Sequence, residues 1–430
     1  MPKKVLIVLY YWPPAGGPGV QRWLKFVKYL PEFGIEPIVY APENPNYPMI
    51  DESLLDETPS SVRVIKHPIF EPYAVAKLFS KTKTETISSG IIQKEKKQSS
   101  LEKMLLFIRG NFFIPDARKF WVKPSVKFLK DFIQKEGIET VITTGPPHSL
   151  HLIGLELKQA LGVRWMADFR DPWTTIGYHQ ELKLTQKNEA KHLALEKQVL
   201  QEADTVIVTS FTTQKEFSGK TDRPVITITN GFDGEVESEE VQLDEKFTIS
   251  HMGSLLSKRN PEILWKVLSD LCIEHADFKK AFQLQLIGKV SEEVLEDLKA
   301  YGLADNYNYL GYIKHSLIND YQKSSQVLLL VEIDNEITQG IIPGKLFEYL
   351  KSNRPILAIG PKNWDVGEIL KTTHRDAFLL HKDYEGLKER ILNYFNRYLS
   401  QQLEVEKVSI STYHRRELTS QLASVLNKDS

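Results

Sequence analysis

The chain has 430 residues, of which 41% are hydrophobic and 26% are charged, a mixture typical of globular proteins that excludes a largely disordered or fibrous chain. Lys and Arg number 55 against 56 Asp and Glu, so the net charge of -1 argues against a general nucleic-acid binder, which needs a basic excess. The length indicates two or three domains. The single cysteine, Cys272, excludes an internal disulfide and a cysteine-rich metal site, and it points to a reducing compartment.

The chain begins MPKKVLIVLYYWPP, in which two lysines precede a short apolar run. This run is rich in β-branched residues and tyrosine, and it ends in Pro-Pro without a small-residue cleavage site. A buried first strand therefore explains it better than a signal peptide. No stretch approaches about 18 uninterrupted apolar residues, so we predict no transmembrane helix and expect a cytoplasmic protein.

Short apolar runs alternate with helical patterns along the first half of the chain. Apolar residues recur at helical spacing from Val20 to Leu30, and Gly34 then provides a stop. Continuous apolar runs are typical of buried parallel strands that are joined by helical crossovers. We expect such strands at 5–11, 37–40, 140–144, 164–169, 205–209 and 225–229. The predicted fold class is α/β, with helices on both faces of a parallel sheet.

An acidic segment, GFDGEVESEEVQLDEK, interrupts this alternation and predicts a linker. Strands are expected again at 247–252, 283–287, 327–331, 356–359 and 377–380, followed by one more amphipathic helix from about 409 to 426. We therefore predict two doubly wound domains. The expected boundaries are an N-terminal domain over 1–231, a linker over 232–246, a C-terminal domain over 247–400 and a terminal helical segment over 401–430.

The region 77–130 departs from the alternation, because its 11 Lys and 2 Arg outweigh 3 Glu and 1 Asp for a net charge of +9. Its first part, 81–100, is polar, and its second part interleaves aromatic and basic residues in MLLFIRGNFFIPDARKFW. One interpretation is a solvated loop followed by a core helix. The other is a patch over 103–123 that contacts anionic lipid or a lipid-linked substrate, on the inner face of the plasma membrane.

A glycine-rich loop, PPAGGPG, follows the first expected strand and precedes a helix. Glycines let the backbone approach a ligand, and the N–H groups at a helix start attract anions. The spacing is not that of the dinucleotide fingerprint, and a tight structural turn is a serious alternative. Because ligands bind at the carboxyl ends of parallel strands, we favour a phosphate-binding loop with Arg22 as its charged partner.

Two polar clusters, GPPHS and DFRDPW, follow later strands of the same sheet. The second places Asp168, Arg170 and Asp171 within four positions, where unpaired burial would be costly. These residues form either an Asp–Arg pair that pins the loop or a catalytic cluster that faces a polar ligand. His148 stands near a helix start, where a helix cap and a substrate contact fit equally well.

Two clusters in the second half combine a strand end with cations. In GSLLSKRNP, Lys258 and Arg259 favour a phosphate site over a solvated pair. In TQGIIPGKLFEY, Lys345 and Glu348 form either a simple helical ion pair or a site where Lys345 binds phosphate and Glu348 binds a ribose diol. There is no Asp-x-Asp, His-Glu-x-x-His, Walker or Gly-x-Ser-x-Gly motif. A leaving diphosphate would then be stabilised by cations and a helix N-terminus, without a metal.

In their order along the chain, these motifs resemble the GT-B glycosyltransferases, most closely the retaining glycosyltransferase family 4 group. The resemblance covers nearly the whole chain and rests on the glycine-rich loop, TTGPPHS, ADFRDPW, TNGFD, HMGSLLSKRNPE and IIPGKLFEYL. It implies two facing Rossmann-like domains that hold a nucleotide sugar, with the last helix crossing back to the first domain.

The resemblance also implies roles for individual residues. Glu348 matches the second glutamate of the family's paired-glutamate motif and would hold the nucleotide ribose. The first glutamate of that motif is replaced by Gly340, so the donor sugar would be contacted by Glu336 or by the backbone at Gly340 and Ile341. The residues implied to contact the donor diphosphate are Lys258, Arg259, Gly344 and Lys345, while Gly16 and Gly17 would lie against the diphosphate or the acceptor.

Arg170 lies where many members of the family place a catalytic histidine. It would therefore stabilise charge without shuttling a proton, and Asp168 or Asp171 would be the nearest titratable group, with His148 nearby. The predicted activity is retaining, metal-independent transfer of a sugar, of the hexosyltransferase type and without a cofactor, from a nucleotide diphosphate sugar. The expected acceptor is a hydroxyl of a glycan or lipid-linked saccharide in cell-surface polysaccharide synthesis. A sugar-nucleotide epimerase of the same fold and a non-catalytic nucleotide-binding scaffold stay open as alternatives.

Overall fold

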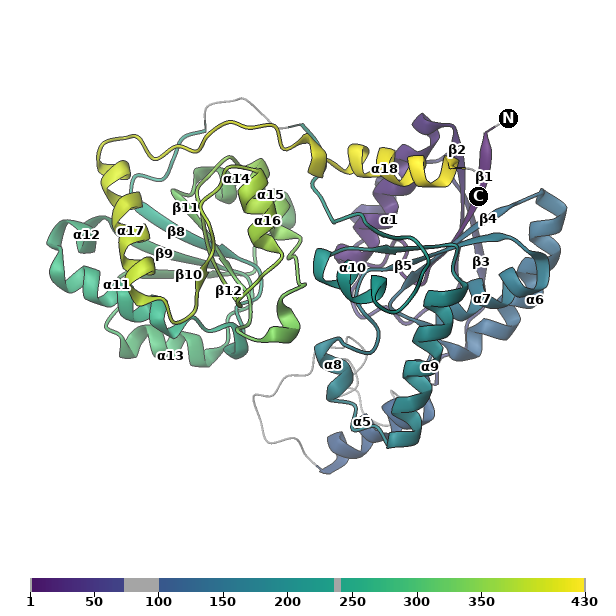
Figure 1. Ribbon diagram of the computed structural model, residues 1–430. Coiled ribbons are helices and arrows are strands. Elements are labelled where there is room, and N and C mark those ends of the chain that lie inside the picture. Colours follow the sequence, from purple (N-terminus) through teal and green to yellow (C-terminus); the bar gives the residue numbers. More distant parts are fainter. Residues whose placement is uncertain (1, 73–99, 236–240, 429–430) are drawn as a thin grey trace. The chain divides into compact units, whose positions relative to one another are not determined.

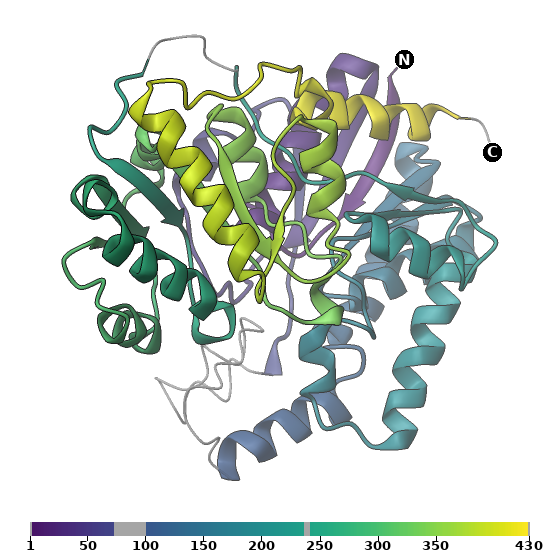
Figure 2. The ribbon, with the colours of Figure 1, turned by 60° about the vertical axis from the view of Figure 1, so that its left-hand side comes forward.

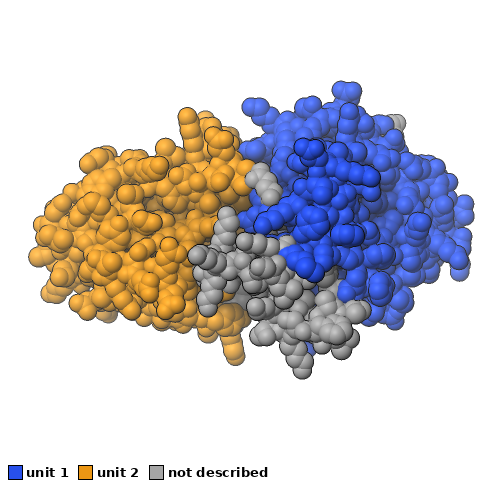
Figure 3. Space-filling model, turned by 90° about the horizontal axis from the view of Figure 1, so that it is seen from below, with its two compact units in different colours: residues 1–230, 415–430 blue, residues 231–414 orange. Residues whose placement is uncertain are grey.

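The computed structural model describes residues 2–72, 100–235 and 241–428 and divides the chain into two compact units. Unit 1 consists of Met1–Asn230 and Arg415–Ser430, and unit 2 consists of Gly231–His414, as the two colours of Figure 3 show. The polar stretch predicted at 81–100 lies, apart from Ser100, outside the described residues, as does the middle of the acidic segment.

Unit 1 is built on a seven-stranded parallel sheet with the strand order β3-β2-β1-β4-β5-β6-β7 (Figure 1). Its strands are β1 (Lys3–Val8), β2 (Ile35–Pro42), β3 (Arg63–His67), β4 (Thr140–Gly145), β5 (Arg164–Phe169), β6 (Thr205–Val208) and β7 (Val225–Thr227). The order reverses between β1 and β4, which pair in register from Val5 opposite Thr140. At such a switch point the loops at the carboxyl ends of the two strands part and leave room for a ligand.

Helices cover both faces of this sheet. Alternate residues of β1 point to opposite faces, so each face has its own apolar core. Val5 and Ile7 belong to the same core as Trp23, whereas Leu6 and Val8 pack on the other face. The helices are α1 (Pro18–Tyr29), η1 (Leu30–Phe33), α2 (Ser53–Asp56), α5 (Ser100–Phe112), α6 (Lys119–Glu136), α7 (Ser149–Leu161), α8 (Gly177–Gln180), α9 (Gln186–Glu202) and α10 (Phe211–Ser218).

The last helix, α18 (Arg415–Asn427), returns to unit 1 and lies along α1, as both Figure 1 and Figure 2 show. Its apolar face joins the core of Val5 and Ile7. Two basic side chains hold its end, since Lys3 Nζ donates to Leu426 O at 2.7 Å and Arg164 Nη1 donates to the same oxygen at 3.0 Å. Cations at a helix C-terminus satisfy carbonyls that have no partner inside the helix. The prediction of a helix that crosses back to the first domain is confirmed.

Unit 2 repeats the design with a six-stranded parallel sheet in the order β10-β9-β8-β11-β12-β13. Its strands are β8 (Phe247–Met252), β9 (Phe282–Ile287), β10 (Tyr307–Gly311), β11 (Val327–Val331), β12 (Ile356–Gly360) and β13 (Leu379–Leu380). The switch point lies between β8 and β11. The helices are η2 (Ser257–Arg259), α11 (Glu262–Glu274), α12 (Ala276–Ala281), α13 (Glu292–Ala300), α14 (His315–Ser324), η3 (Glu336–Thr338), α15 (Lys345–Lys351), α16 (Val366–Thr372), α17 (Tyr384–Leu399) and η4 (Ser411–Tyr413).

The predicted α/β class with two doubly wound sheets is confirmed, and two strands were missed. Both missed strands, β3 and β10, lie at an edge of their sheet and are half-buried or exposed along their length. Their sequences, RVIKH and YNYLG, therefore lack the continuous apolar run that marks the central strands. Among the residues that the structure describes, no helix is long and apolar enough to cross a membrane.

Candidate functional site

The loops singled out in the sequence lie at the two switch points. In unit 1 the glycine-rich loop follows β1 and the GPPHS loop follows β4, while in unit 2 the SKR loop follows β8 and the segment before α15 follows β11. We describe each set separately as the N-terminal cluster (Gly16–Gly19, His148, Arg170 and Asp171) and the C-terminal cluster (His251, Arg259, Glu332, Lys345 and Glu348).

The glycine-rich loop is folded back by local pairing before α1 begins. Gly16 N donates to Met49 O at 3.0 Å, and Gly17 has φ +101°, a conformation that glycine adopts without strain. Gly19 lies directly against Arg170, and a Cβ atom added to Gly19 would overlap Nη1 of that arginine. The glycine-rich loop therefore lies against the guanidinium group of Arg170 and leaves room for it.

Arg170 joins three of the predicted motifs at the carboxyl edge of the sheet. Its Nη2 donates to Pro146 O in the GPPHS loop, and its guanidinium lies 5.7 Å from the ring centre of Tyr11. Its backbone N donates to Gly145 O at 2.9 Å. Because the side chain is only half-buried and touches Gly19, it can present positive charge to a ligand at this edge.

Asp168 has a different role from the one predicted for catalysis. It is 0% exposed, and its carboxylate accepts hydrogen bonds from Arg22 Nη2 at 3.1 Å and from Trp23 Nε1 at 2.9 Å. Thr144 Oγ1 also donates to it at 2.8 Å, while Arg22 Nη1 donates to Thr229 O at 2.8 Å. Arg22 is thus the partner of a buried carboxylate and not of a phosphate in the loop. The pair ties α1 to β5, so both side chains serve the structure.

Asp171 is the carboxyl group of the N-terminal cluster that stays accessible. It is half-buried, and burial raises its pKa, against the opposing effect of Arg170. A carboxyl group with a raised pKa beside a cation is suited to contact a hydroxyl group. Of the two aspartates predicted for this role, Asp171 is the one that the geometry supports.

His148 lies in a closed group of aromatic and imidazole rings. Its ring stacks on Trp173 at 5.0 Å between centroids, and neither of its ring nitrogens has a hydrogen-bond partner among the described residues. Burial, together with the charges of His151 and Arg170, lowers its pKa well below the usual value. His148 is therefore neutral and only 6% exposed, which fits support of the loop better than contact with a substrate.

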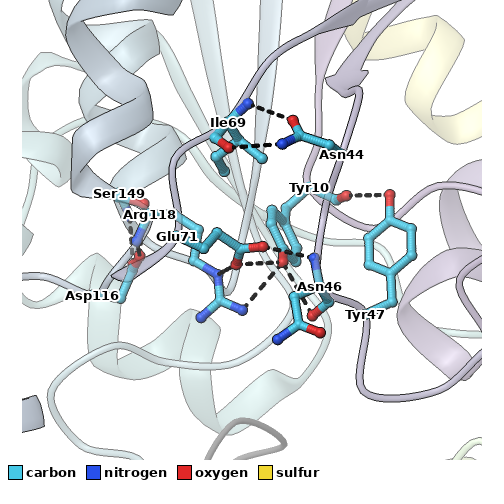
Figure 4. Close-up of polar contacts among 9 residues, drawn as sticks. All are labelled: Tyr10, Asn44, Asn46, Tyr47, Ile69, Glu71, Asp116, Arg118 and Ser149. Atoms are coloured by element: carbon cyan, nitrogen blue, oxygen red, sulfur yellow. Dashed lines mark hydrogen bonds and ion pairs between the residues drawn. The ribbon is translucent and has the colours of Figure 1, made fainter. Parts of the chain in front are cut away.

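A second buried polar network at this edge was not predicted (Figure 4). Tyr10 donates to Glu71 Oε1 at 2.7 Å, and Arg118 Nη2 donates to the Tyr10 hydroxyl at 3.2 Å. Glu71 and Arg118 form an ion pair at 3.2 Å with both side chains at or below 9% exposure. Asp116 accepts from Ser149 N at 2.9 Å and so fixes the start of α7. These contacts tie Glu71 and Arg118 to the segment that follows β1, and Asp116 to the start of α7.

In unit 2, Arg259 is held by a glutamate that the sequence analysis did not single out. Arg259 Nε donates to Glu332 Oε1 at 3.0 Å, and its Nη2 donates to Glu332 Oε2 at 3.1 Å. Glu332 follows β11 directly and is 0% exposed, whereas Arg259 is half-buried at the end of η2. The pair therefore bridges the two strand ends of the switch point.

Lys345 lies in the same place, at the start of α15. Its Nζ is 3.4 Å from Nε2 of the fully buried His251, and a Cβ atom on Gly253 would come within 2.9 Å of Nζ. Burial first and the charge of Arg259 next lower the pKa of Lys345 to about 8, against the opposing effect of Glu332 and Glu348. Arg259 and Lys345 thus lie close enough to sense each other's charge, as expected for two groups that share an anion.

The neighbouring imidazole of His251 orients the side chain of Lys345. His251 Nδ1 is 3.0 Å from Leu329 O, and because a carbonyl oxygen can only accept, Nδ1 carries the proton. Nε2 then presents its lone pair to the Lys345 ammonium. Burial and the charge of Lys345 lower the pKa of His251 well below the usual value, in keeping with a neutral ring.

Glu348 lies one turn after Lys345 and is half-buried, with Gln322 Nε2 donating to its Oε2 at 3.1 Å. The next residue, Tyr349, holds α15 to β8 because its buried hydroxyl accepts from Met252 N at 3.1 Å. This hydrogen bond holds the face of α15 that carries Lys345 and Tyr349 against the end of β8 at the switch point.

The remaining residues predicted to contact the donor are Lys258, Glu336, Gly340, Ile341 and Gly344. Lys258 and Glu336 are exposed, and Gly340 is half-buried in a loop that Trp364 holds through its bond to Ile341 O at 2.7 Å. Gly344 precedes α15 with no atom within 4 Å of an added Cβ. No three His, Cys, Asp or Glu side chains in the described part of the chain are grouped to hold a metal ion.

The structure thus brings Arg259, Lys345 and Glu348 together and separates Asp168 from the accessible edge. Sequence reasoning assigned no role to Glu332, which directly follows β11, or to His251, which lies within β8. The one signal for Glu332 was a charge directly after the apolar run VLLLV, where a strand ends.

Solved structures of sugar-transferring enzymes share this fold. Trehalose-6-phosphate synthase OtsA matches with a TM-score of 0.61 and 10% identity over 100% of both chains. A glycosyltransferase from Rickettsia africae matches with 0.59 and 12% over 100% of both chains. Sucrose-phosphate synthase from Thermosynechococcus elongatus matches with 0.57 and 13%, over 99% of this chain and 98% of the other. No protein-family model and no curated protein sequence matches the chain. The chain has the GT-B fold of these structures, and the fold alone does not assign an activity.

Proposed function

We propose that the protein is a glycosyltransferase that moves a sugar from a nucleotide diphosphate sugar to a hydroxyl acceptor. The observation that carries the proposal is the convergence of Arg259 and Lys345 at the switch point of unit 2, one turn from Glu348. Two cations at the carboxyl ends of parallel strands suit a diphosphate, and a carboxylate one turn after Lys345 suits a ribose diol. Fold likeness to the sugar-transferring enzymes above supports the same conclusion by analogy.

In the proposed reaction the chain acts by charge. Arg259 and Lys345 stabilise negative charge on the leaving diphosphate as its bond to the anomeric carbon breaks. The acceptor oxygen then bonds to the anomeric carbon from the same face, and its proton passes to the leaving diphosphate oxygen, so the configuration is retained. Since the cations of the chain hold the diphosphate, the reaction needs no metal.

The N-terminal cluster is the proposed acceptor site. Arg170 and Asp171 lie at the carboxyl edge of the sheet beside the glycine-rich loop, and Asp171 is suited to accept a hydrogen bond from the attacking hydroxyl. We assign donor-sugar contacts to the loop of Gly340 and Ile341 and to Glu336, because that loop leads from β11 into α15.

Thermal unfolding with UDP, GDP, ADP and CMP, with Glu348→Ala in parallel, tests the nucleotide site. A ligand at about 100 times its dissociation constant adds about 2.7 kcal/mol to stability. One diphosphate should raise the melting temperature of the wild type but not of the variant. Absence of any shift would refute the nucleotide site.

Turnover of the matching nucleotide sugar separates the transferase from an epimerase. A transferase releases the nucleoside diphosphate only when an acceptor is added, and the product keeps the anomeric configuration. Conversion of the nucleotide sugar without any acceptor would instead identify an epimerase. Unchanged activity in EDTA would support independence from metal.

The proposed acceptor is a glycan or lipid-linked saccharide, reached at the membrane surface. The described end of the basic insertion exposes apolar side chains among cations, with Phe112 64% exposed and Lys119 Nζ 5.3 Å from the ring centre of Phe120. Aromatic and basic side chains together favour the interface of an anionic membrane. In liposome flotation, binding should require anionic lipid and weaken in Phe112→Ser. The matched control is Ile273→Ser, which removes a 79% exposed apolar side chain from unit 2. Equal flotation without anionic lipid would rule out this surface.

A further inference from the structure

We propose that Glu332 is a positioning residue of the donor site, which holds one edge of Arg259 so that the other edge is offered to the diphosphate. This inference rests on the proposed function and names a residue that no motif marks. Glu332 itself cannot touch a ligand, because it is 0% exposed. It acts through the arginine.

The argument starts from the shape of the guanidinium group. A guanidinium has a side edge, Nε with Nη2, and an end edge, Nη1 with Nη2, and each matches the two oxygens of a carboxylate or phosphate. Glu332 occupies the side edge with bonds of 3.0 and 3.1 Å. Nη1 of Arg259 makes no hydrogen bond to any residue that the structure describes. The end edge is therefore available for an anion.

The carboxylate of Glu332 is itself held in place by hydrogen bonds. Its Oε1 also accepts from Ile333 N at 2.9 Å, while Glu332 N donates to Ile359 O at 2.9 Å in the neighbouring strand β12. The carboxylate thus cannot turn away when a phosphate approaches. An arginine held in advance loses less rotamer freedom on binding than a free one, and this preorganisation favours affinity.

The second cation of the cluster, Lys345, lies near Arg259. The positive charge of Arg259 lowers the pKa of Lys345, so the two cations lie on one region of the switch point. A buried ion pair adds little net stability over apolar packing of similar volume. The placement of Glu332 directly behind a cation of the donor site is therefore better explained by binding than by stability.

Calorimetric titration of the full chain tests this role, using the nucleoside diphosphate that stabilises the wild type most and the matching nucleoside. Glu332→Gln keeps the size of the side chain but places an NH₂ group against the N–H groups of Arg259. We expect its dissociation constant for the diphosphate to rise about tenfold, which corresponds to about 1.4 kcal/mol, and that for the nucleoside to change less than twofold. In an Arg259→Ala background, Glu332→Gln should have no further effect on diphosphate binding.

The matched control is Asp244→Asn in the same unit. Asp244 lies before β8, at the other end of the strands, and accepts from Thr248 Oγ1 at 2.8 Å and Gln285 Nε2 at 3.3 Å. Its substitution should leave both dissociation constants unchanged.

Four outcomes separate the possibilities. Unchanged diphosphate affinity in Glu332→Gln would overturn the positioning role and leave the donor site standing. Equal weakening of nucleoside and diphosphate would overturn it in favour of a folding role, and so would a further loss in the Arg259→Ala background. A wild type that binds no nucleoside diphosphate would refute the proposed function and this inference together.

Discussion

Arg22 and Asp168 form an ion pair at 3.1 Å in which both side chains are at most 2% exposed. The two residues are 146 positions apart, and their contact locks helix α1 onto strand β5. Asp168 therefore belongs to the scaffold that supports the glycine-rich loop, and its neighbours Arg170 and Asp171 face the accessible edge.

This relationship predicts a stability effect. Asp168→Asn leaves Arg22 buried without its counter-charge and should lower the free energy of unfolding of unit 1 by about 3–5 kcal/mol. Denaturant unfolding monitored on unit 1 measures the loss. The control is Glu32→Gln, which breaks the exposed pair with Arg416 at 2.6 Å and should change stability by less than about 1 kcal/mol. Wild-type stability combined with lost transfer would instead assign Asp168 to catalysis.

The buried histidines of unit 1 predict a dependence of stability on pH. Burial lowers the pKa of His151 to about 3 and that of His192 to about 4. In the unfolded chain both titrate near about 6.5, so below that pH the unfolded state takes up protons that the folded state excludes. Stability should therefore fall from pH 7 to pH 5, by about 2 kcal/mol for each of the two residues.

Thermal or denaturant unfolding at several pH values checks this dependence. In His151→Asn, which can keep a bond to Thr143 Oγ1, the decline between pH 7 and pH 5 should be smaller by about 2 kcal/mol. An identical pH profile for the variant and the wild type would show that His151 does not exclude protons in the folded state.

The contact between Gly19 and Arg170 allows a test of the N-terminal cluster. Gly19→Ala forces Arg170 out of its position, because the added Cβ overlaps Nη1. We expect the rate of sugar transfer to fall about 10- to 100-fold from the displaced charge, with little change in donor affinity. Gly219→Ala is the control, since its Cβ would come no closer than 3.4 Å to another atom. Normal transfer by Gly19→Ala would remove Arg170 from the acceptor site.

Lys345 predicts a pH dependence of donor binding. Its pKa is lowered to about 8 by burial first and by Arg259 next, so the ammonium loses its proton as the pH rises through 8. Affinity for the nucleoside diphosphate should be constant below that pH and fall above it, by up to about tenfold per pH unit. Titration between pH 7 and pH 9.5 measures this profile. Lys345→Arg stays charged over the whole range and should flatten the curve. A flat wild-type curve would exclude Lys345 from the diphosphate contact.

The sequence alone determined the fold class and the central strands. β5, β8 and β11 were expected at the residues where they occur, because strands buried on both faces are continuous apolar runs. The polar edge strands β3 and β10 lack that signal and were missed. The motifs of Arg259 and Lys345 could be placed after strand ends, where ligands bind in parallel sheets, and their grouping with Glu348 in one donor site was implied by the resemblance to the GT-B glycosyltransferases.

Only the tertiary structure decided which charges are buried against each other. Asp168 and Arg170 are two charged residues only two positions apart at the end of β5, yet one is 0% exposed and the other is half-buried. The difference arises because Arg22 and Trp23 reach Asp168 from a distant helix. Glu332 likewise acquires its role only when β11 ends beside the loop that carries Arg259. Ion pairing depends on distances across the fold, and local sequence spacing does not encode them.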